Sequence, residues 1–262
     1  MSGGAPPLVC VNGGLLYDQK LLWPALSPLA RHRQLVLYDQ RGRGLSQAPP
    51  GPQVARIEHD AGDLLALREA LGFRRWDVLG HSWGGGISVL GAERDREGVR
   101  RLVLVDSVGP TGWWLSSLHD AALQRLPATE RAVLQRLDPA SLAIPDPGLH
   151  SAYARAIYPA WFADAELAKL FAPPRSESRT GAAVVARLRK DGYDWTDLVR
   201  SVQASVIVIH GERDLLPPSV ARELVALIPK SRLALIPDAG HMPFWEAPDE
   251  FFSLVDSFLI GA

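Results

Sequence analysis

Gly80-His81-Ser82-Trp83-Gly84 follows directly on a mostly apolar run at 76–79. A serine among small residues at the end of such a run is typical of the sharp strand-to-helix turn that exposes a nucleophilic hydroxyl. The glycines have a steric reason, because bulky neighbours would keep the strand and the helix apart. The apolar stretch 87–92 predicts a buried helix after the turn. The same pentapeptide also occurs in loops without chemistry, so the rest of the chain has to decide.

Two later strands each end in a loop that carries a further polar residue. The β-branched run 205–209 predicts a buried strand, and Asp214 follows three residues after its closing glycine. A second apolar run, 232–236, precedes His241. The chain order Ser82, Asp214, His241 resembles that of the α/β-hydrolases and differs from that of other serine-triad folds. We therefore predict that these three residues form a catalytic triad.

The resemblance to the α/β-hydrolases covers nearly the whole chain and is weakest in the middle. Within that family, the segment 38–46, the Asn-Gly-Gly sequence at 12–14 and the aromatic Trp83 resemble the proline iminopeptidase branch. Asn12 stands where that branch normally has histidine, and His81 stands where it more often has glycine. His-Ser-Trp-Gly-Gly is equally at home among esterases and lactonases.

Composition restricts the classes of function. A chain of 262 residues with 47% hydrophobic residues can bury a large core, as one domain with an insertion. A formal net charge of -1 without a basic block argues against a nucleic-acid partner. The sequence has no apolar run of about 18 residues to span a membrane. Residues 1–7 lack the pattern of a signal peptide, so we expect a cytoplasmic enzyme. We expect no metal ion and no cofactor, because no ligand spacing or dinucleotide fingerprint occurs; the oligomeric state is left open.

Strands and helices are predicted to alternate along the chain. Strands are expected at 8–12, 34–39, 76–81, 101–106, 205–210 and 232–236, and helices at 19–30, 58–71, 83–96, 219–228 and 248–260. The alternation predicts an α/β fold with a mostly parallel sheet and helices on both faces. α/β-hydrolases usually carry a β-hairpin before the first of these strands. With only seven residues ahead of it, we expect that hairpin to be missing and the sheet to have about six strands.

The alternation breaks off between residues 108 and 200. Helical patterns at 118–126, 130–137 and 163–171 are separated by proline-rich links. The resemblance implies a helical cap over the active site, above the carboxyl ends of the strands, where ligands of open α/β sheets bind. The expected organisation is a core of residues 1–107 and 201–262 with a cap of residues 108–200. The alternative is a set of additional helices without a role in substrate binding.

The predicted triad divides the chemistry of acyl transfer. The Ser82 hydroxyl is a weak nucleophile until a base takes its proton. His241 is assigned as that base, because an imidazole titrates near neutral pH and can return the proton to the leaving group. Asp214 would hold the other ring nitrogen. Asp106, which also ends a predicted strand, is the rival acid.

The charge that develops on the substrate oxygen needs fixed hydrogen-bond donors. The backbone N–H of Trp83 is expected to be one, and that of Gly14 the other, with Gly13 as second choice. Five aromatic residues are candidates for an apolar substrate pocket, although each could equally be cap core. They are Trp113, Trp114, Tyr158, Trp161 and Phe244.

Other polar residues are expected to be structural. His210 ends a strand and is assigned no catalytic role. Asp39, Arg41 and Arg43 lie in a loop after a strand, where ion pairs that stabilise the loop are the commoner use. Glu246 is expected to serve the N-terminus of the last helix.

The sequence thus predicts a serine hydrolase that cleaves a small carboxylic ester or related acyl bond of a small-molecule substrate through an acyl-enzyme. The alternative is a proline iminopeptidase-like aminopeptidase, which needs a carboxylate for the substrate's ammonium group, because a buried unpaired charge is costly. Candidates for that carboxylate are Glu166, Glu177, Asp191 and Asp194. A remote alternative is an inactive α/β-hydrolase that acts as a binding protein, which the intact triad disfavours.

Overall fold

The computed structural model describes residues 5–171 and 177–260, and within these ranges six strands form one sheet. The strands are β1 (Leu8–Val11), β2 (Leu35–Leu37), β3 (Trp76–His81), β4 (Val99–Val105), β5 (Ser205–Gly211) and β6 (Ser231–Ile236). Their order across the sheet is β2-β1-β3-β4-β5-β6, and each neighbouring pair is parallel. The prediction of a parallel sheet of about six strands is confirmed.

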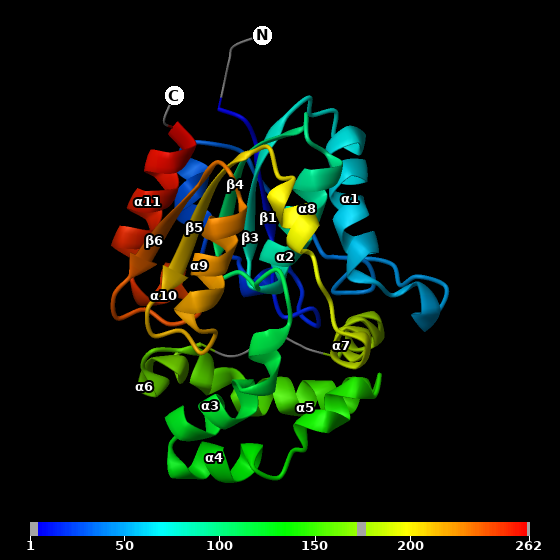
Figure 1. Cartoon of the computed structure of the whole chain (residues 1–262), viewed down its shortest axis with the longest axis vertical. Helices are drawn as coiled ribbons and strands as arrows, with labels where there is room; N and C mark the ends of the chain where they lie inside the picture. Colours follow the sequence, from blue (N-terminus) through cyan, green and yellow to red (C-terminus); the bar gives the residue numbers. More distant parts are fainter. Residues whose placement is uncertain (1–4, 172–176, 261–262) are drawn as a thin grey trace.

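Helices cover both faces of the sheet (Figure 1). One face carries α1 (Ile57–Ala70), α2 (Trp83–Arg94), α8 (Thr196–Arg200) and α9 (Pro218–Leu227), and the other carries α11 (Pro248–Ile260) with the short 3-10 helices η1 (Gln19–Leu21) and η2 (Ser27–Arg31). Successive side chains of a strand point to opposite faces. Val9 of β1 therefore packs in the core beneath α1 and α2, whereas Cys10 packs in the core beneath α11.

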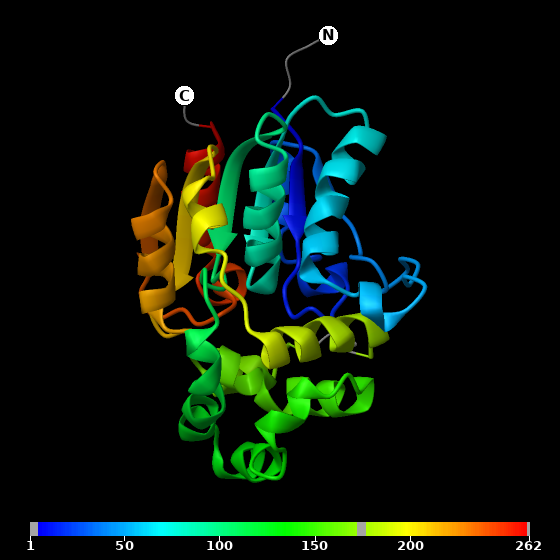
Figure 2. The ribbon, with the colours of Figure 1, turned by 45° about the vertical axis from the view of Figure 1, so that its right-hand side comes forward.

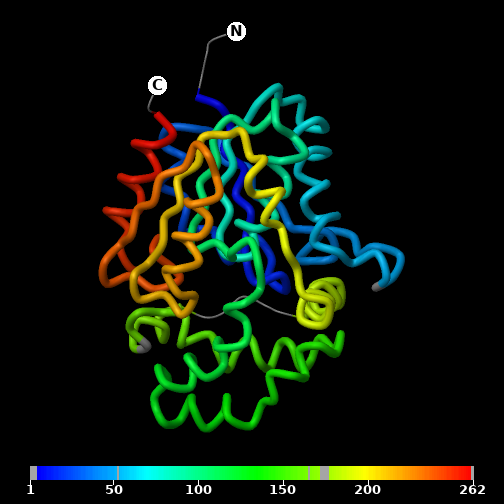
Figure 3. Tube along the Cα trace, viewed as in Figure 1, coloured from blue at the N-terminus to red at the C-terminus, as the bar shows by residue number. Residues whose placement is uncertain are grey.

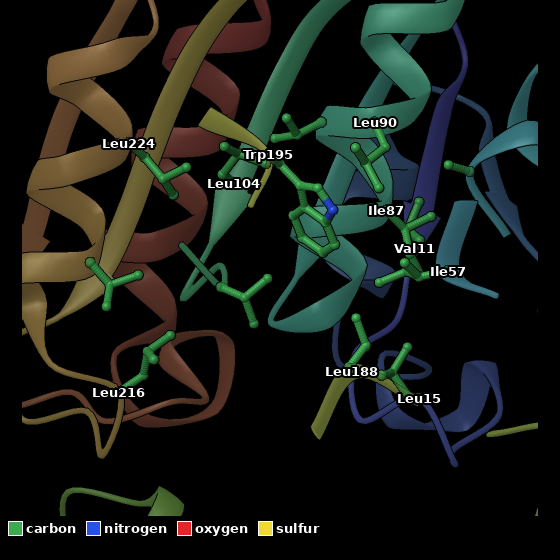
Figure 4. Packing of buried hydrophobic residues seen from close by; sticks show 14 of the residues in the cluster. Val11, Leu15, Ile57, Ile87, Leu90, Leu104, Leu188, Trp195, Leu216 and Leu224 are labelled. Carbon is green, nitrogen blue, oxygen red and sulfur yellow. The ribbon is translucent and has the colours of Figure 1, made fainter. Parts of the chain in front are cut away.

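Trp195 joins α8 to the core. In Figure 4 its indole lies near Leu104 of β4 and Ile87 of α2. A Cβ on Gly86 of α2 would lie 2.9 Å from the indole Cζ3, so only glycine permits this approach. The helix that follows, α8, packs against α2 and α9. The expected cap boundary at residue 200 is therefore too late, because α8 belongs to the core.

A second layer of short helices lies beyond the carboxyl ends of the strands (Figure 2). Its elements are η4 (Trp113–Ser116), α3 (Leu118–Arg125), α4 (Ala128–Leu134), η5 (Pro139–Ala143), α5 (Pro147–Ile157), η6 (Tyr158–Trp161), α6 (Ala165–Ala168) and α7 (Arg179–Asp191). We call this layer the cap. The ends of the described chain, near residues 5 and 260, lie at the opposite end of the molecule (Figure 3).

Prolines explain several differences from the predicted helices. Residues 19–30 form only η1 and η2, because Pro24 and Pro28 lack the N–H that a continuous helix needs. Residues 163–171 form a single turn of helix, α6. The helices α5 and α7 were not predicted. In α5 the proline-rich link supplies the start of the helix, since Pro147 occupies its first turn, where proline is tolerated.

Among the described residues, no helix combines the length and the hydrophobicity that crossing a membrane would require. The remaining short elements are η3 (Pro52–Val54) and α10 (Pro243–Glu246), the latter in the connection from β6 to α11.

Candidate active site

Ser82 lies at the junction of β3 and α2, at the carboxyl edge of the sheet. Its φ of 55° is in the left-handed region, which costs a non-glycine residue free energy and is often found at catalytic positions. The Ser82 N–H donates to Val105 O at 2.9 Å, which holds the turn against β4. A Cβ on Gly80 would collide with the Ser88 hydroxyl, and one on Gly84 with Val11 O. Both flanking glycines are therefore required for α2 to approach the sheet.

Asp214 and His241 come from the connections that follow β5 and β6. The His241 Nδ1 lies 2.8 Å from Asp214 Oδ2, and Asp214 Oδ1 accepts a hydrogen bond from the Leu216 N–H at 3.1 Å. Ser82 and His241 line the same cavity. Burial lowers the pKa of His241, so its imidazole is neutral and able to accept a proton. Among the described residues, Ser82 and His241 form no direct hydrogen bond, and such catalytic bonds are often long until a substrate tightens them.

The rival acid, Asp106, hydrogen bonds elsewhere. Its Oδ1 accepts from the Gly211 N–H at 2.8 Å, and its Oδ2 receives no hydrogen bond from a described residue. Burial, and secondly the charge of Asp214, raise the pKa of Asp106. Burial also raises the pKa of Asp214, but the hydrogen bonds from Asp106 and Leu216 and the charge of Arg125 favour its ionised form. The ionised form is thus favoured at Asp214, the carboxyl that faces His241 Nδ1, over Asp106.

His210 completes this buried cluster. Its Nε2 lies 2.9 Å from Leu216 O, and burial lowers its pKa to about 4, so the imidazole is neutral. This contact fits the structural role that was predicted for His210 from the sequence. Ligand atoms of Asp106, His210 and Asp214 lie within 4.8 Å of one another, a spacing that a metal ion could use. Hydrogen bonds to Gly211, Leu216 and His241 already engage Asp106 Oδ1, His210 Nε2 and both oxygens of Asp214, whereas Asp106 Oδ2 and His210 Nδ1 have no hydrogen-bond partner among the described residues.

The loop after β1 lies directly against Ser82. A Cβ on Gly13 would lie 2.5 Å from the Ser82 Cβ, and Gly14, with a φ of 76°, lines the cavity. Trp83 is the first residue of α2, so its N–H has no partner within the helix. Asn12 holds the loop, because its Nδ2 donates to Gly13 O at 3.2 Å and to Tyr17 O at 3.1 Å. This role of Asn12 was not predicted, although its departure from the usual histidine drew attention to it.

The cavity above Ser82 has a volume of ≈ 120 Å³ and a largely apolar wall. Three of the five predicted aromatic residues line it, namely Trp114, Tyr158 and Trp161. Two of them do not. Trp113 is 48% exposed and its indole N–H donates to Glu223 at 3.1 Å, while Phe244 is buried behind His81, with a ring separation of 5.3 Å. Trp113 and Trp114 are consecutive in η4, so their side chains leave the helix in different directions, and the sequence alone did not show which one faces the cavity.

Polar residues of the cap that were not predicted also line the cavity: His150 and Tyr153 on α5, and Arg189 on α7. Val185 and Arg189 are four residues apart on α7, and such residues share one face of a helix. That spacing is a usable signal only once the helix is recognised.

No Asp or Glu of the described chain lines this cavity. The four predicted candidates for an ammonium site lie elsewhere. Glu166 pairs with Lys169 on an exposed turn, and Asp191 is exposed and 3.9 Å from Arg187. Asp194 and Glu177 are also exposed, and Glu177 belongs to a different hollow, beside Asp39. Within residues 5–171 and 177–260, no carboxylate side chain thus lines the cavity in which a substrate ammonium group would be held.

The cap is fastened to the loops that carry Asp214 and His241. Arg125 of α3 donates to Arg213 O and to Asp214 O, both at 2.6 Å. Glu246 accepts from the Ala163 N–H at 2.7 Å and from the Met242 N–H at 3.0 Å. The prediction that Glu246 serves the last helix was wrong, because its carboxylate turns back to the loop after His241.

The charged loop after β2 is structural. Arg43 and Asp60 form a buried ion pair at 2.9 Å, and Arg41 pairs with Asp63. Asp39 instead accepts hydrogen bonds from the N–H groups of Gln19 and Leu45. The expected loop-stabilising role therefore holds for all three residues, although Asp39 acts through backbone groups and not through an ion pair.

Comparison with known proteins agrees with this geometry. The family model of the alpha/beta hydrolase fold matches residues 6–248. A proline iminopeptidase of Lactobacillus helveticus is 27% identical over 276 residues, which cover 97% of this chain and 90% of that protein. The match to a solved proline iminopeptidase of Mycobacterium smegmatis (TM-score 0.70, 26% identity) covers 98% of this chain and 91% of the iminopeptidase. The match to the solved enol-lactonase of Burkholderia xenovorans LB400 (TM-score 0.68, 26% identity) covers 98% of this chain and 92% of the enol-lactonase. These matches confirm the resemblance to the proline iminopeptidase and esterase branch, and the chain belongs to the α/β-hydrolase fold family.

Proposed function

We propose that this protein is a serine hydrolase that cleaves a carboxylic ester or a related acyl bond of a small molecule through an acyl-enzyme. The observation that carries the proposal is the apolar cavity in which Ser82 and His241 meet and to which no described acid contributes. Such a cavity favours an acyl group over an ammonium group, because an ammonium buried without a counter-charge is costly.

The proposed reaction uses each group at a stated atom. His241 Nε2 takes the proton of the Ser82 hydroxyl as Oγ attacks the acyl carbon, and Asp214 stabilises the imidazolium through Nδ1. The N–H groups of Trp83 and Gly14 receive the oxyanion. The imidazolium then gives its proton to the departing alkoxide, which leaves the acyl group on Ser82. In the second half of the reaction, His241 takes a proton from a water molecule as the water oxygen attacks the acyl carbon. The imidazolium then returns the proton to Ser82 Oγ as the acyl–Oγ bond breaks, which releases the acid.

A proline iminopeptidase-like activity remains the second candidate, because the relatives named above include enzymes of that name. A panel of p-nitrophenyl esters and of proline and alanine p-nitroanilides separates the two. We expect kcat/KM for the best ester to exceed that for proline p-nitroanilide by about 100-fold or more, because a missing partner for a buried charge costs about 2–5 kcal/mol. Rapid release of N-terminal proline with slow ester turnover would reverse this assignment.

Asn12 provides a test of the proposed oxyanion loop. We expect Asn12→Ala to lower kcat for a p-nitrophenyl ester by about 100-fold, because a displacement of about 1 Å in a catalytic group has an effect of that size. The KM should change little, since the Asn12 side chain bonds to the loop backbone and is not among the residues that line the cavity. Steady-state kinetics measures both constants.

Cys10→Ala is the matched control for Asn12→Ala. Cys10 lies on the same part of the chain, is equally buried and faces the core beneath α11. The Cys10→Ala substitution should leave kcat close to that of the wild type. Thermal unfolding of both variants checks that they are folded. Equal losses in the two variants would mean that the effect of Asn12→Ala comes from the stability of the strand and not from the loop.

A further inference from the structure

One cation on the wall of the cavity has no counter-charge. Arg189 lines the cavity together with Ser82 and Trp114, and its Nη1 donates to Leu115 O at 3.2 Å. Within the described ranges no carboxylate forms an ion pair with it. The residues outside those ranges include no Asp or Glu. Four of the five N–H donors of the guanidinium are thus left for other partners.

Two other arginines that lie wholly or partly buried are each paired with a carboxylate. Arg43 donates to both carboxylate oxygens of Asp60, at 2.9 and 3.1 Å, and Arg68 does the same with Asp95, at 2.6 and 2.9 Å. A desolvated charge without such a partner is unfavourable, and residues kept in unfavourable surroundings concentrate at functional sites. Arg189 therefore differs from Arg43 and Arg68, whose guanidinium groups each have a carboxylate partner.

The surroundings of Arg189 show that its charge reaches the cavity. Burial is the main cause that lowers the pKa of His150 and raises that of Tyr153; the Arg189 guanidinium adds to the first shift and opposes the second, and both side chains line the cavity. His150 is only 1% exposed, and its Nε2 lies 2.8 Å from Ile144 O. Its Nδ1 has no hydrogen-bond partner among the described residues. This part of the cavity wall thus holds a half-buried guanidinium without a carboxylate partner and a buried imidazole nitrogen without a hydrogen-bond partner among the described residues.

We propose that Arg189 binds a carboxylate of the substrate, at a distance from the ester bond that Ser82 attacks. The proposal rests on the proposed esterase function and names its substrate class, esters that carry a second, free carboxyl group. A guanidinium presents parallel N–H donors that match both oxygens of a carboxylate. The cavity offers such a group no repulsion, because no described acid lines it.

Matched ester pairs test the subsite. One series consists of the mono-p-nitrophenyl esters of succinic, glutaric and adipic acid, each compared with its methyl-capped diester. A second pair, 4-(butanoyloxy)benzoate and its methyl ester, carries the carboxylate on the leaving group. We expect wild-type kcat/KM to be about 10- to 100-fold higher for the best free acid than for its capped form, the range of a charge-assisted hydrogen bond. Arg189→Met should remove this preference and leave the capped esters within about 3-fold of the wild type.

Two further variants separate binding from folding. Arg187→Met makes the same change two residues away on α7, at a side chain that does not line the cavity and lies 3.9 Å from Asp191. It should keep the preference in full. Arg189→Lys keeps the charge but not the planar donors, so it should keep only part of the preference. The melting temperature of Arg189→Met should equal or exceed that of the wild type, because an unpaired cation is removed. A lower melting temperature with equal losses on free and capped esters would show a purely structural role and overturn the proposal.

Failure of the subsite and failure of the proposed function give different results. Capped esters that are hydrolysed by the wild type and not by Ser82→Ala, without any preference for free acids, overturn the subsite and leave the esterase function standing. If Arg189→Met still prefers the free acids over the capped esters, the proposed subsite is also overturned. If no ester is turned over, the proposed function fails, and titration of the protein with glutarate, followed by tryptophan fluorescence, decides the subsite. Saturable binding that Arg189→Met abolishes supports it, and absence of binding overturns it.

Discussion

Replacing Ser82 with alanine should lower kcat for p-nitrophenyl esters by on the order of 10^4 to 10^6, the largest effect that we expect from any single substitution. The physical reason is that no other group in the described cavity can form the acyl-enzyme, and His241 alone activates only water. The folded state should change little, because Ser82 donates no side-chain hydrogen bond that holds the turn. Its backbone N–H to Val105 O bond is kept in the variant.

A fluorophosphonate probe gives an independent measurement of the same residue. The probe should label Ser82 in the wild type, as located by peptide mass spectrometry, and should not label the alanine variant. Labelling would also exclude the remote interpretation of the chain as an inactive binding protein. Ester turnover close to the wild-type rate in Ser82→Ala would end the proposed mechanism.

The second large effect is expected at Asp214. Asp214→Asn should lower kcat by about 10^4, because an amide facing Nδ1 favours the wrong tautomer of the catalytic histidine. The geometry selects this residue, since Asp214 Oδ2 lies 2.8 Å from His241 Nδ1. Steady-state kinetics on the ester used for Ser82→Ala gives the comparison.

Asp106→Asn is the matched control for Asp214→Asn, because it makes the same chemical change at the rival acid. The asparagine oxygen can accept the Gly211 N–H, as Asp106 Oδ1 does at 2.8 Å, and its neutral amide places no charge beside Asp214. We therefore expect kcat to stay within about 10-fold of the wild type. If the two substitutions exchanged their effects, Asp106 would be the acid that serves His241.

Hydrogen bonds join the cap to the loops that carry Asp214 and His241. Arg125 and Glu246 join cap elements to the loops of Asp214 and His241, and His241 itself donates its N–H to Trp161 O at 2.8 Å. Asp214 and His241 of the proposed triad therefore contact the cap through their loops, although neither residue belongs to it.

The sequence alone determined the kind of fold and the place of the turn that carries Ser82. The strand before Ser82, the glycines beside it and the helix after it lie within about 20 consecutive residues, so periodicity and steric rules suffice to predict them. The serine, acid and histidine each follow a predicted strand, and parallel strands bring their carboxyl ends to one edge of a sheet. The parallel six-stranded sheet was predicted for the same reason and is confirmed.

Choices between similar residues were decided by the tertiary structure. Asp106 and Asp214 both follow strands, and the sequence favoured Asp214 only through the resemblance to the α/β-hydrolases; the structure adds the 2.8 Å distance from Asp214 Oδ2 to His241 Nδ1 and directs Asp106 Oδ1 to the Gly211 N–H. Trp113 and Trp114 are neighbours of the same type, and only the direction of η4 against the core turns one toward the cavity. The exposed positions of Glu166 and Asp191 could not be read from composition either.

Arg189 shows most clearly where the sequence stops. As a residue in a stretch with three other basic side chains it resembles an ordinary solvated arginine. Its position on the cavity follows from the packing of α7 against α5 and η5 and from its hydrogen bond to Leu115 O in η4, 74 residues earlier in the chain. Local rules such as helix period, turn chemistry and strand burial act over a few residues, and they fixed the sheet and the turn at Ser82. The wall of the cavity is built from distant segments, so its chemistry exists only once the cap has packed against the sheet.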